Sequence, residues 1–306
     1  MKEQPVDLGK DIYLIDGYDM GFEGRTGTYV LNNKQVTLIE TGPSSSVEKV
    51  KDGLEALDIA LEDVKYIILT HIHLDHAGGA GLLLASCPHA EIVVHPKGKR
   101  HLVDPSRLVK GARAVYGEDF DRLFAPVVPI PEDRIIEKGE EDTLTIDQGR
   151  QLEFLDTPGH ANHHIGIYDP LSNGLFTGDT AGIRYHQVEG VTFYLPTTSP
   201  NQFHPEAMLA QIQRFRHLEP SRLYFGHFGM TEQPEQALRE VREWIGIFLE
   251  IAKQQDKPEE IEAKLLERIE TYVKELGVPE THSLHDILQL DVRVCAMGLY
   301  DYLRKD

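Results

Sequence analysis

The ten residues from Thr70 to Gly79 constrain this chain most, because they place three imidazoles and a carboxylate within the six positions 71–76. They follow Val64 to Leu69, a short apolar run rich in β-branched side chains that predicts a buried strand. Imidazole nitrogens and carboxylate oxygens are the ligands that hold zinc or iron at about 2.0–2.2 Å. A solvated polar loop would crowd these groups with nothing to compensate them. The stretch therefore predicts a metal-binding loop at the end of a strand.

The ligands of this loop divide into two pairs. A segment that leaves the end of a strand aims alternate side chains at one point, so His71 and His73 are placed to share one ion. Asp75 and His76 follow a change of backbone direction. They are better placed to hold a second ion beside the first than to complete a single tetrahedral site.

Three further loops carry a histidine or an aspartate next to glycine at the end of a predicted strand. They contain Gly159-His160, Gly178-Asp179 and Gly226-His227. Glycine at such a position lets the backbone approach a ligand closely. These loops are expected to supply the ligands that the first loop lacks.

The rest of the chain predicts alternating strands and helices followed by a helical tail. Strand-like runs occupy residues 11–15, 28–31, 36–39, 66–69, 91–94, 144–146, 151–156, 165–168 and 174–177. Apolar residues recur at helical spacing over 47–57 and through most of 234–303, and residues 205–216 also predict a helix. We expect a domain over residues 1–230 and a C-terminal helical extension over 231–306, which caps the active site or forms a homodimer contact.

The net charge of the chain limits the kinds of partner that it is expected to bind. Lys and Arg number 31 against 50 Asp and Glu, and the resulting net charge of −19 argues against a broad surface for nucleic acid or anionic membranes. The two cysteines have no metal-type spacing, and no apolar run approaches the roughly 18 residues of a membrane helix. These features predict a cytoplasmic protein with neither a nucleic-acid nor a membrane partner.

Residues 96–125 interrupt the α/β pattern as an insertion, with a helix expected from Pro105 to Tyr116. Before Glu118 the insertion has one acid, Asp104, against the basic residues Lys97, Lys99, Arg100, Arg107, Lys110 and Arg113. Two interpretations carry equal weight. The charges form a solvated helix face, or the insertion is a lid that brings side chains such as Arg107 to an anionic substrate.

The order of these motifs resembles that of the metallo-β-lactamase-fold hydrolases, which include glyoxalase II-like, lactonase-like and phosphodiesterase-like members. The resemblance runs from Glu40 to His227 and leaves the C-terminal helices outside. It implies an α/β fold, a four-layer αβ/βα sandwich of two sheets with helices outside and metals at one edge. By position it implies a first metal on His71, His73 and His160, a second on Asp75, His76 and His227, and Asp179 as the bridge between them.

Two positions depart from the family pattern. Glu40 stands where the family more often has aspartate, and we assign it no catalytic role. After His160 the family often has glycine before a further histidine, whereas Asn162, His163 and His164 follow here. His164 is the better candidate to support a metal ligand, and His163 is expected to be an ordinary polar residue.

The resemblance implies two divalent metal ions, zinc first with iron or manganese as alternatives, and a hydrolase that uses a metal-bridging hydroxide. The expected substrate is a small, anionic molecule with an ester-type bond, which is a phosphodiester, a lactone or a thioester. Asp75 is the candidate catalytic residue, because it also takes up the proton of the hydroxide. The long loop after Asp179 is expected to form a pocket wall, with Arg184 and Tyr194 as candidate substrate-binding residues.

Two alternatives come from other functional classes. One is an iron-dependent oxidoreductase of the same fold, similar to persulfide dioxygenases, and the other is a metal-binding protein without catalytic activity. The full second set of metal ligands favours the hydrolase over the mononuclear oxidoreductase.

Overall fold

The chain folds into two compact units that interleave along the sequence. The computed structural model describes residues 4–305. Unit 1 comprises the described residues up to Asp156 together with His163–Gly178 and Pro220–Glu232, and unit 2 comprises Thr157–Asn162, Asp179–Glu219 and the described residues from Gln233 onward. The domain boundary expected after residue 230 stays a prediction.

Unit 1 is built on two β-sheets. The first has the strand order β1 (Val6–Asp7), β2 (Ile12–Asp16), β3 (Gly27–Leu31), β4 (Val36–Ile39), β5 (Val64–Ile68), β6 (Glu91–Val94) and β7 (Ile135–Glu137). The second has the order β15 (Met230–Thr231), β14 (Arg222–Phe225), β11 (Gly174–Gly178), β10 (Ile165–Asp169), β9 (Arg150–Asp156) and β8 (Thr143–Asp147). In the first sheet, neighbouring strands pair antiparallel from β1 through β4 and parallel from β4 through β7. The predicted α/β class is therefore confirmed.

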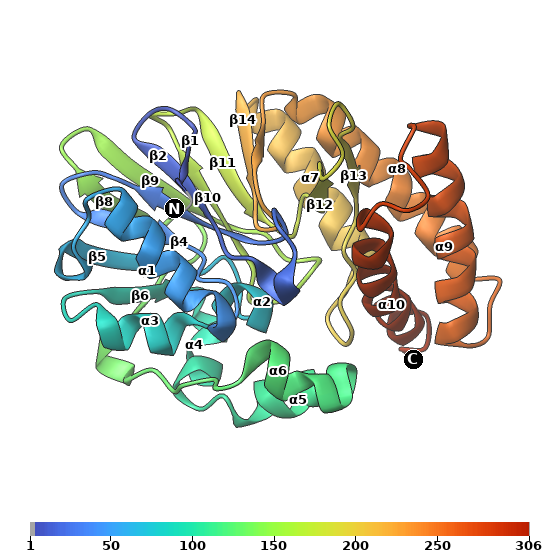
Figure 1. Ribbon diagram of the computed structural model, residues 1–306, viewed down its shortest axis with the longest axis horizontal. Coiled ribbons are helices and arrows are strands. Elements are labelled where there is room, and N and C mark those ends of the chain that lie inside the picture. Colours follow the sequence, from blue (N-terminus) through green and yellow to red (C-terminus); the bar gives the residue numbers. More distant parts are fainter. Residues whose placement is uncertain (1–3, 306) are drawn as a thin grey trace. The chain divides into compact units, whose positions relative to one another are not determined.

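The two sheets of unit 1 pack face to face (Figure 1). One buried cluster takes Leu14 and Ile39 from the first sheet and Phe154 and Phe176 from the second. Along β9 the burial alternates, with Leu152 buried and its neighbours exposed, as expected for a strand with one face in the core. Strands β3, β4 and β11 are buried along their whole length, in agreement with the short apolar runs from which the sequence predicts them.

Helices cover the other face of the first sheet. Apolar residues of α1 (Val47–Ala56), α3 (Ala80–Ser86) and α4 (Pro96–Val103) form a second buried cluster with the sheet, and α1 and α3 run along that face in Figure 1. The short helix α2 (Leu74–Ala77) follows β5. The insertion consists of α4, α5 (Ser106–Tyr116) and α6 (Phe120–Phe124), so the helix predicted from residue 105 to 116 is confirmed.

Unit 2 is mainly helical. It contains α7 (Pro205–Leu218), α8 (Pro234–Ala252), α9 (Pro258–Glu275), α10 (Leu284–Leu303) and the strand pair β12 (Ile183–Tyr185) and β13 (Phe193–Leu195). Helix α8 contacts β13, α7, α9 and α10. The helical C-terminal segment is confirmed, while its use as a cap or a homodimer contact stays a prediction.

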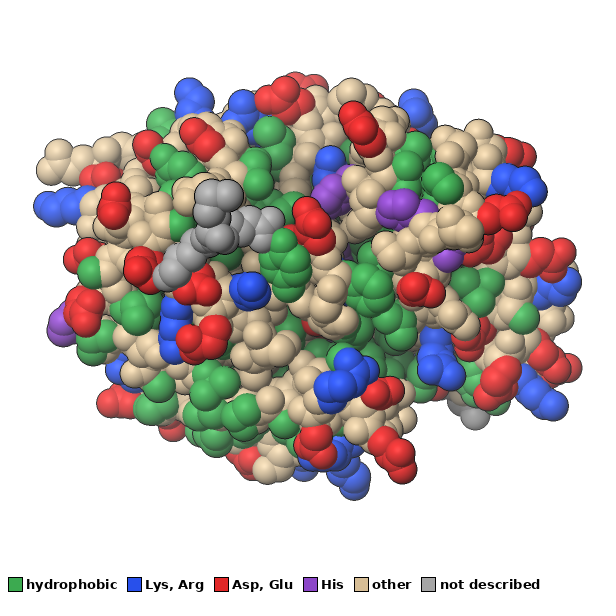
Figure 2. Space-filling view, viewed as in Figure 1, with side chains coloured by type: hydrophobic (Ala, Val, Ile, Leu, Met, Phe, Trp, Pro, Cys, Tyr) green, Lys and Arg blue, Asp and Glu red, His purple; other side chains and the backbone are tan. Residues whose placement is uncertain are grey.

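Two observations concern the expectation that the chain binds neither nucleic acid nor membranes. Acidic and basic side chains are interspersed over the face drawn in Figure 2. Among residues 4–305, no helix combines the length and the apolar composition needed to cross a membrane.

An ion pair between α9 and α10 should make the stability of unit 2 depend on pH. His285 Nδ1 lies 2.8 Å from Glu270 Oε2, and the hydrogen bond between these side chains is the main cause that raises the pKa of His285 above 6.5. The pair stabilises the fold fully below pH 6.5, the ordinary pKa, and its contribution is lost as the pH rises through the raised pKa.

For such a partly exposed pair we expect at most about 1 kcal/mol. Urea unfolding of the wild type and of His285→Gln, compared from about pH 5.5 to about pH 8.5, should show a difference that shrinks as the pH rises. The exposed His89→Gln is the control. A difference that grows with pH would contradict the assignment.

Candidate metal centre

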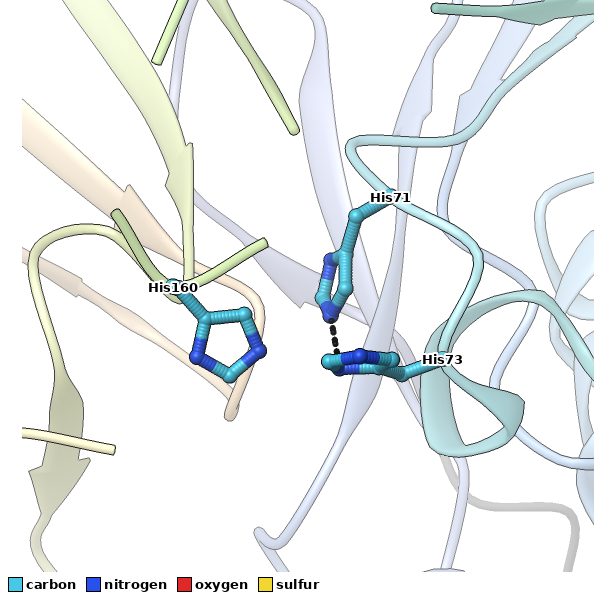
Figure 3. Close-up of side chains that lie close together, drawn as sticks. All are labelled: His71, His73 and His160. Carbon is cyan, nitrogen blue, oxygen red and sulfur yellow. Dashed lines mark hydrogen bonds between the residues drawn. The ribbon is translucent and has the colours of Figure 1, made fainter. Parts of the chain in front are cut away.

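The first two candidate ligands, His71 and His73, follow β5 as the sequence predicts. Their loop is tied to the second sheet by Ile165, whose N–H donates to the carbonyl oxygen of Thr70 at 2.8 Å. His71 Nε2 and His73 Nδ1 lie 3.0 Å apart and point toward one another (Figure 3). Two nitrogens bound to one tetrahedral ion at about 2.1 Å lie about 3.4 Å apart, so the geometry fits a shared cation. His160, the third residue drawn, belongs to unit 2.

A chain of hydrogen bonds fixes the orientation of His71. The buried Glu40 accepts a hydrogen bond from the hydroxyl of Thr70. Because that hydrogen points to Glu40, the hydroxyl oxygen, 3.0 Å from His71 Nδ1, accepts the proton on Nδ1. Nε2 then presents its lone pair on the side of His73, which is how a metal-binding imidazole is held. Glu40 thus orients His71 indirectly, through its hydrogen bond with Thr70.

Asp75, His76 and His227 form a second group, called the Asp75 group below. Asp75 Oδ2 lies 3.6 Å from His76 Nε2 and 3.7 Å from His227 Nε2. One ligand atom from each residue lies within 4.8 Å of the others. These separations exceed hydrogen-bond distances and suit three donors around a cation at about 2.0–2.2 Å.

The turn that carries His227 is held by Tyr29 of β3. The hydroxyl oxygen of Tyr29 lies 2.7 Å from the carbonyl oxygens of both Phe225 and Gly229. Phe228 has a φ of 59°, so the turn uses the left-handed region for a residue other than glycine. A contact from the first sheet therefore fixes a ligand loop of the second sheet.

Two further histidines pack around the His71 loop. The ring of His164 stacks on that of His71 with centroids 5.0 Å apart, and Gly178 leaves no room for a Cβ because His164 Nε2 and Thr70 Oγ1 would meet it. His163 packs edge-on against His73 with centroids 5.6 Å apart, and only 5% of it is exposed. Sequence reasoning singled out His164 and treated His163 as ordinary, since spacing alone does not show which ring faces the loop.

His160 and Asp179 are described within unit 2. His160 Nε2 lies 3.4 Å from Asp179 Oδ2, and both residues are buried. His160 Nδ1 lies 3.1 Å from the carbonyl oxygen of Thr197, to which it donates, and the hydroxyl of Ser199 donates to the carbonyl oxygen of His160 at 3.0 Å. With its proton on Nδ1, His160 keeps the Nε2 lone pair for a cation.

The candidate substrate residues Arg184 and Tyr194 face each other across a strand pair of unit 2. They are register partners in the antiparallel pairing of β12 with β13. Tyr194 is 3% exposed, and its backbone N–H donates to Glu240 of α8 at 3.2 Å. The sequence predicts one long loop after Asp179, whereas the structure has two short strands there. Each strand has only three residues, which is too short to show an alternating pattern, and seven residues separate them.

Arg107, the candidate lid residue, is exposed on α5. Other basic side chains of the insertion bind acids, since Lys99 Nζ lies 2.9 Å from Glu137 and Arg113 lies 2.6 Å from Asp121. The insertion packs through apolar residues of α5 and α6 on Leu74, which lies between two candidate ligands. The insertion is therefore anchored beside the metal loop through apolar contacts, and this holds for both interpretations of its basic residues.

The cysteines take no part in this chemistry. Burial raises the pKa of Cys87 to about 11 and that of Cys295 to about 12. Both thiols stay protonated at neutral pH, as expected for small buried apolar side chains rather than nucleophiles.

Comparison with known proteins agrees with the ligand motifs. A model of the metallo-beta-lactamase superfamily matches residues 21–227. The metallo-beta-lactamase fold-containing protein ST1585 of Sulfurisphaera tokodaii is 28% identical over 210 residues, which cover 66% of this chain and 72% of that protein. A hydroxyacylglutathione hydrolase of a Synechococcus species is 29% identical over 202 residues, which cover 65% of this chain and 62% of that enzyme.

Solved structures give the same fold. The crystal structure of the archaeal ST1585 protein has a TM-score of 0.70 at 24% identity and covers 95% of this chain and 98% of that chain. The structure of TTHA1429, a metallo-beta-lactamase family protein from Thermus thermophilus, has a TM-score of 0.67 at 21% identity, with 97% and 94% covered.

Proposed function

Because the chain belongs to the metallo-β-lactamase superfamily, whose members are mostly hydrolases, we propose that it is a dinuclear metal-dependent hydrolase. Its substrate is a small molecule with an ester-type bond. The observation that carries the proposal is the adjacency of two donor sets in unit 1. The rings of His71 in one set and His76 in the other have centroids 4.3 Å apart. Two sets this close suit a pair of neighbouring cations.

The donor chemistry supports divalent cations of the zinc, iron or manganese type, and we place zinc first. His71 and His73 hold one cation, and the Asp75 group holds the other. Following the order of the family motifs, we assign His160 to the first cation and Asp179 to the position between the two. The orientation of His160 by Thr197 supports its assignment, because Nε2 keeps its lone pair.

When bound, two such cations supply a water acidified toward neutral pH and polarise the bond under attack. The proton of that water needs an acceptor that reaches the substrate. Asp75 is the most exposed member of its group, at 20% of its side chain against 1% for His76 and 5% for His227. We therefore assign Asp75 a second role, in which its carboxylate takes up this proton and returns it to the leaving group.

Among ester-type bonds we put the thioester first, ahead of the lactone and the phosphodiester. Three relatives at 27–30% identity are named hydroxyacylglutathione hydrolase. The exposed Arg107 is assigned to an anionic group of the substrate, and Arg184 and Tyr194 to the wall beside it. Support for Arg107 is its exposure on a helix anchored beside Leu74.

Hydrolysis assays test the proposal. The zinc-loaded protein is offered S-acyl glutathione thioesters, γ- and δ-lactones and bis(p-nitrophenyl) phosphate. An oxygen electrode follows the iron(II)-loaded protein with glutathione persulfide. We expect turnover of at least one ester-type class, its loss with a chelator, and its return on adding zinc. Oxygen uptake with persulfide and no hydrolysis would replace the hydrolase by the iron-dependent oxidoreductase.

A further inference from the structure

A strained loop of unit 1 carries an acid that the sequence analysis did not single out. Asp19 lies between β2 and β3, flanked by Tyr18 with a φ of 49° and Met20 with a φ of 55°. Left-handed residues other than glycine are strained and cluster at functional sites. The carboxylate of Asp16 holds the loop, accepting the N–H groups of Tyr18 at 2.9 Å and Gly24 at 2.7 Å.

This loop packs beside the metal loop. Met20 joins the apolar cluster of Leu74, the residue directly before Asp75, and the β2–β3 connection runs next to α2 in Figure 1. Asp19 precedes Met20 and Asp75 follows Leu74, and Met20 and Leu74 pack in the same apolar cluster.

Asp19 is fully buried, yet only one of its oxygens is bonded. Its Oδ2 accepts from Arg25 Nε at 3.2 Å, and Arg25 is itself 6% exposed. Its Oδ1 has no hydrogen-bond partner among the described residues. Burying a carboxylate oxygen without a partner is costly unless something absent from the protein atoms compensates it.

The surroundings of Asp19 indicate what compensates it. Burial raises the pKa of Asp19 to about 6, the guanidinium of Arg25 lowers it, and the charge of Asp75 raises it further. The imidazoles of His227 and His76 also act on Asp19. Two carboxylates that repel each other beside two imidazoles are stabilised together by a dication.

We propose that Asp19 is a positioning residue of the cation site formed by the Asp75 group, where its unbonded Oδ1 would support a divalent cation held by that group. Asp19 is not a member of the three-residue group whose ligand atoms are mutually within 4.8 Å, so it would act on those ligands rather than as a fourth ligand. The inference rests on the proposed function, because it requires the second cation.

Cation affinity tests the inference without relying on turnover. Wild type and Asp19→Asn are titrated with zinc at about pH 8, above the pKa of about 6, in competition with a chromophoric chelator. We expect one of the two binding steps, the step that Asp75→Asn abolishes, to lose about 10–100-fold in affinity, as for other supporting carboxylates of metal sites, with the other step unchanged. Thr26→Val, which removes a buried hydroxyl from the same loop, is the matched control and should change neither step.

Asp19→Asn leaves the guanidinium of Arg25 buried without its carboxylate, so the variant risks losing the fold. Asp19→Asn/Arg25→Met removes both charges and should show the same weakened step with a native circular dichroism spectrum. Arg25→Met alone keeps the carboxylate and should retain the second cation. Folded Asp19 variants that bind both cations as the wild type does would overturn the inference alone. A wild type with a single binding step would overturn the proposed function as well.

Discussion

Replacing Asp75 with asparagine is expected to reduce turnover on the order of 10³-fold, a loss of about 4 kcal/mol in transition-state stabilisation. Asparagine keeps the size of the side chain and one oxygen, but it carries no charge to hold a cation and accepts no proton. Asp75 is the one carboxylate of its group, with Oδ2 3.6 Å from His76 Nε2 and 3.7 Å from His227 Nε2, so neither histidine replaces its negative charge.

Steady-state kinetics and metal content are to be measured on the same preparations. Asp75→Asn should lose one cation and keep its unfolding midpoint in metal-free buffer. Asp63→Asn, an exposed aspartate beside β5, should leave both quantities unchanged. An Asp75→Asn enzyme with turnover within about tenfold of the wild type would remove Asp75 from the mechanism.

The largest effect on stability is expected at Arg150. This side chain is 2% exposed and donates to both carboxylate oxygens of Asp169, at 3.3 Å and 2.7 Å. It also donates at 2.9 Å to the carbonyl oxygen of Lys10 and to Asn33 Oδ1. One guanidinium therefore ties β9 and β10 to turns of the first sheet.

Arg150→Met is expected to lower the free energy of unfolding by about 3–5 kcal/mol, because it leaves the carboxylate of Asp169 buried without its counter-charge. Arg150→Met/Asp169→Asn should recover part of that loss. Urea unfolding monitored by tryptophan fluorescence and circular dichroism measures both. Arg216→Gln, which breaks an exposed pair with Glu235, should cost less than about 1 kcal/mol. A loss as small at Arg150 would show that the buried pair contributes little.

The sequence predicted those parts of the fold in which one physical signal dominates. Strands such as β4 are short apolar runs of β-branched residues, and helices such as α8 carry an apolar stripe at helical spacing, so these signals identify them. Strands β12 and β13 have three residues each and too little pattern to detect. Helices α4 and α6 were missed within the insertion because charge dominates its sequence.

The residues of the candidate site were likewise predicted where one signal in the sequence is strong. His71, His73 and Asp75 were found because they crowd one loop at a strand end, and the structure brings the Asp75 group together within unit 1. Asp19 carried no such signal. Its importance depends on burial and on left-handed neighbours, and neither is written in residue spacing. The packing of His163 against His73 was not predicted for a related reason, since the two rings meet only in the folded chain.

The number of metal ions per chain tests the dinuclear hydrolase most directly. The purified protein is measured by inductively coupled plasma mass spectrometry as isolated, and again after it is loaded with zinc and freed of excess metal by gel filtration. The two donor sets predict about two zinc ions per wild-type chain and about one in Asp75→Asn. A wild type that hydrolyses its substrate with one ion per chain, or that holds one iron and consumes oxygen without hydrolysis, would contradict the dinuclear centre.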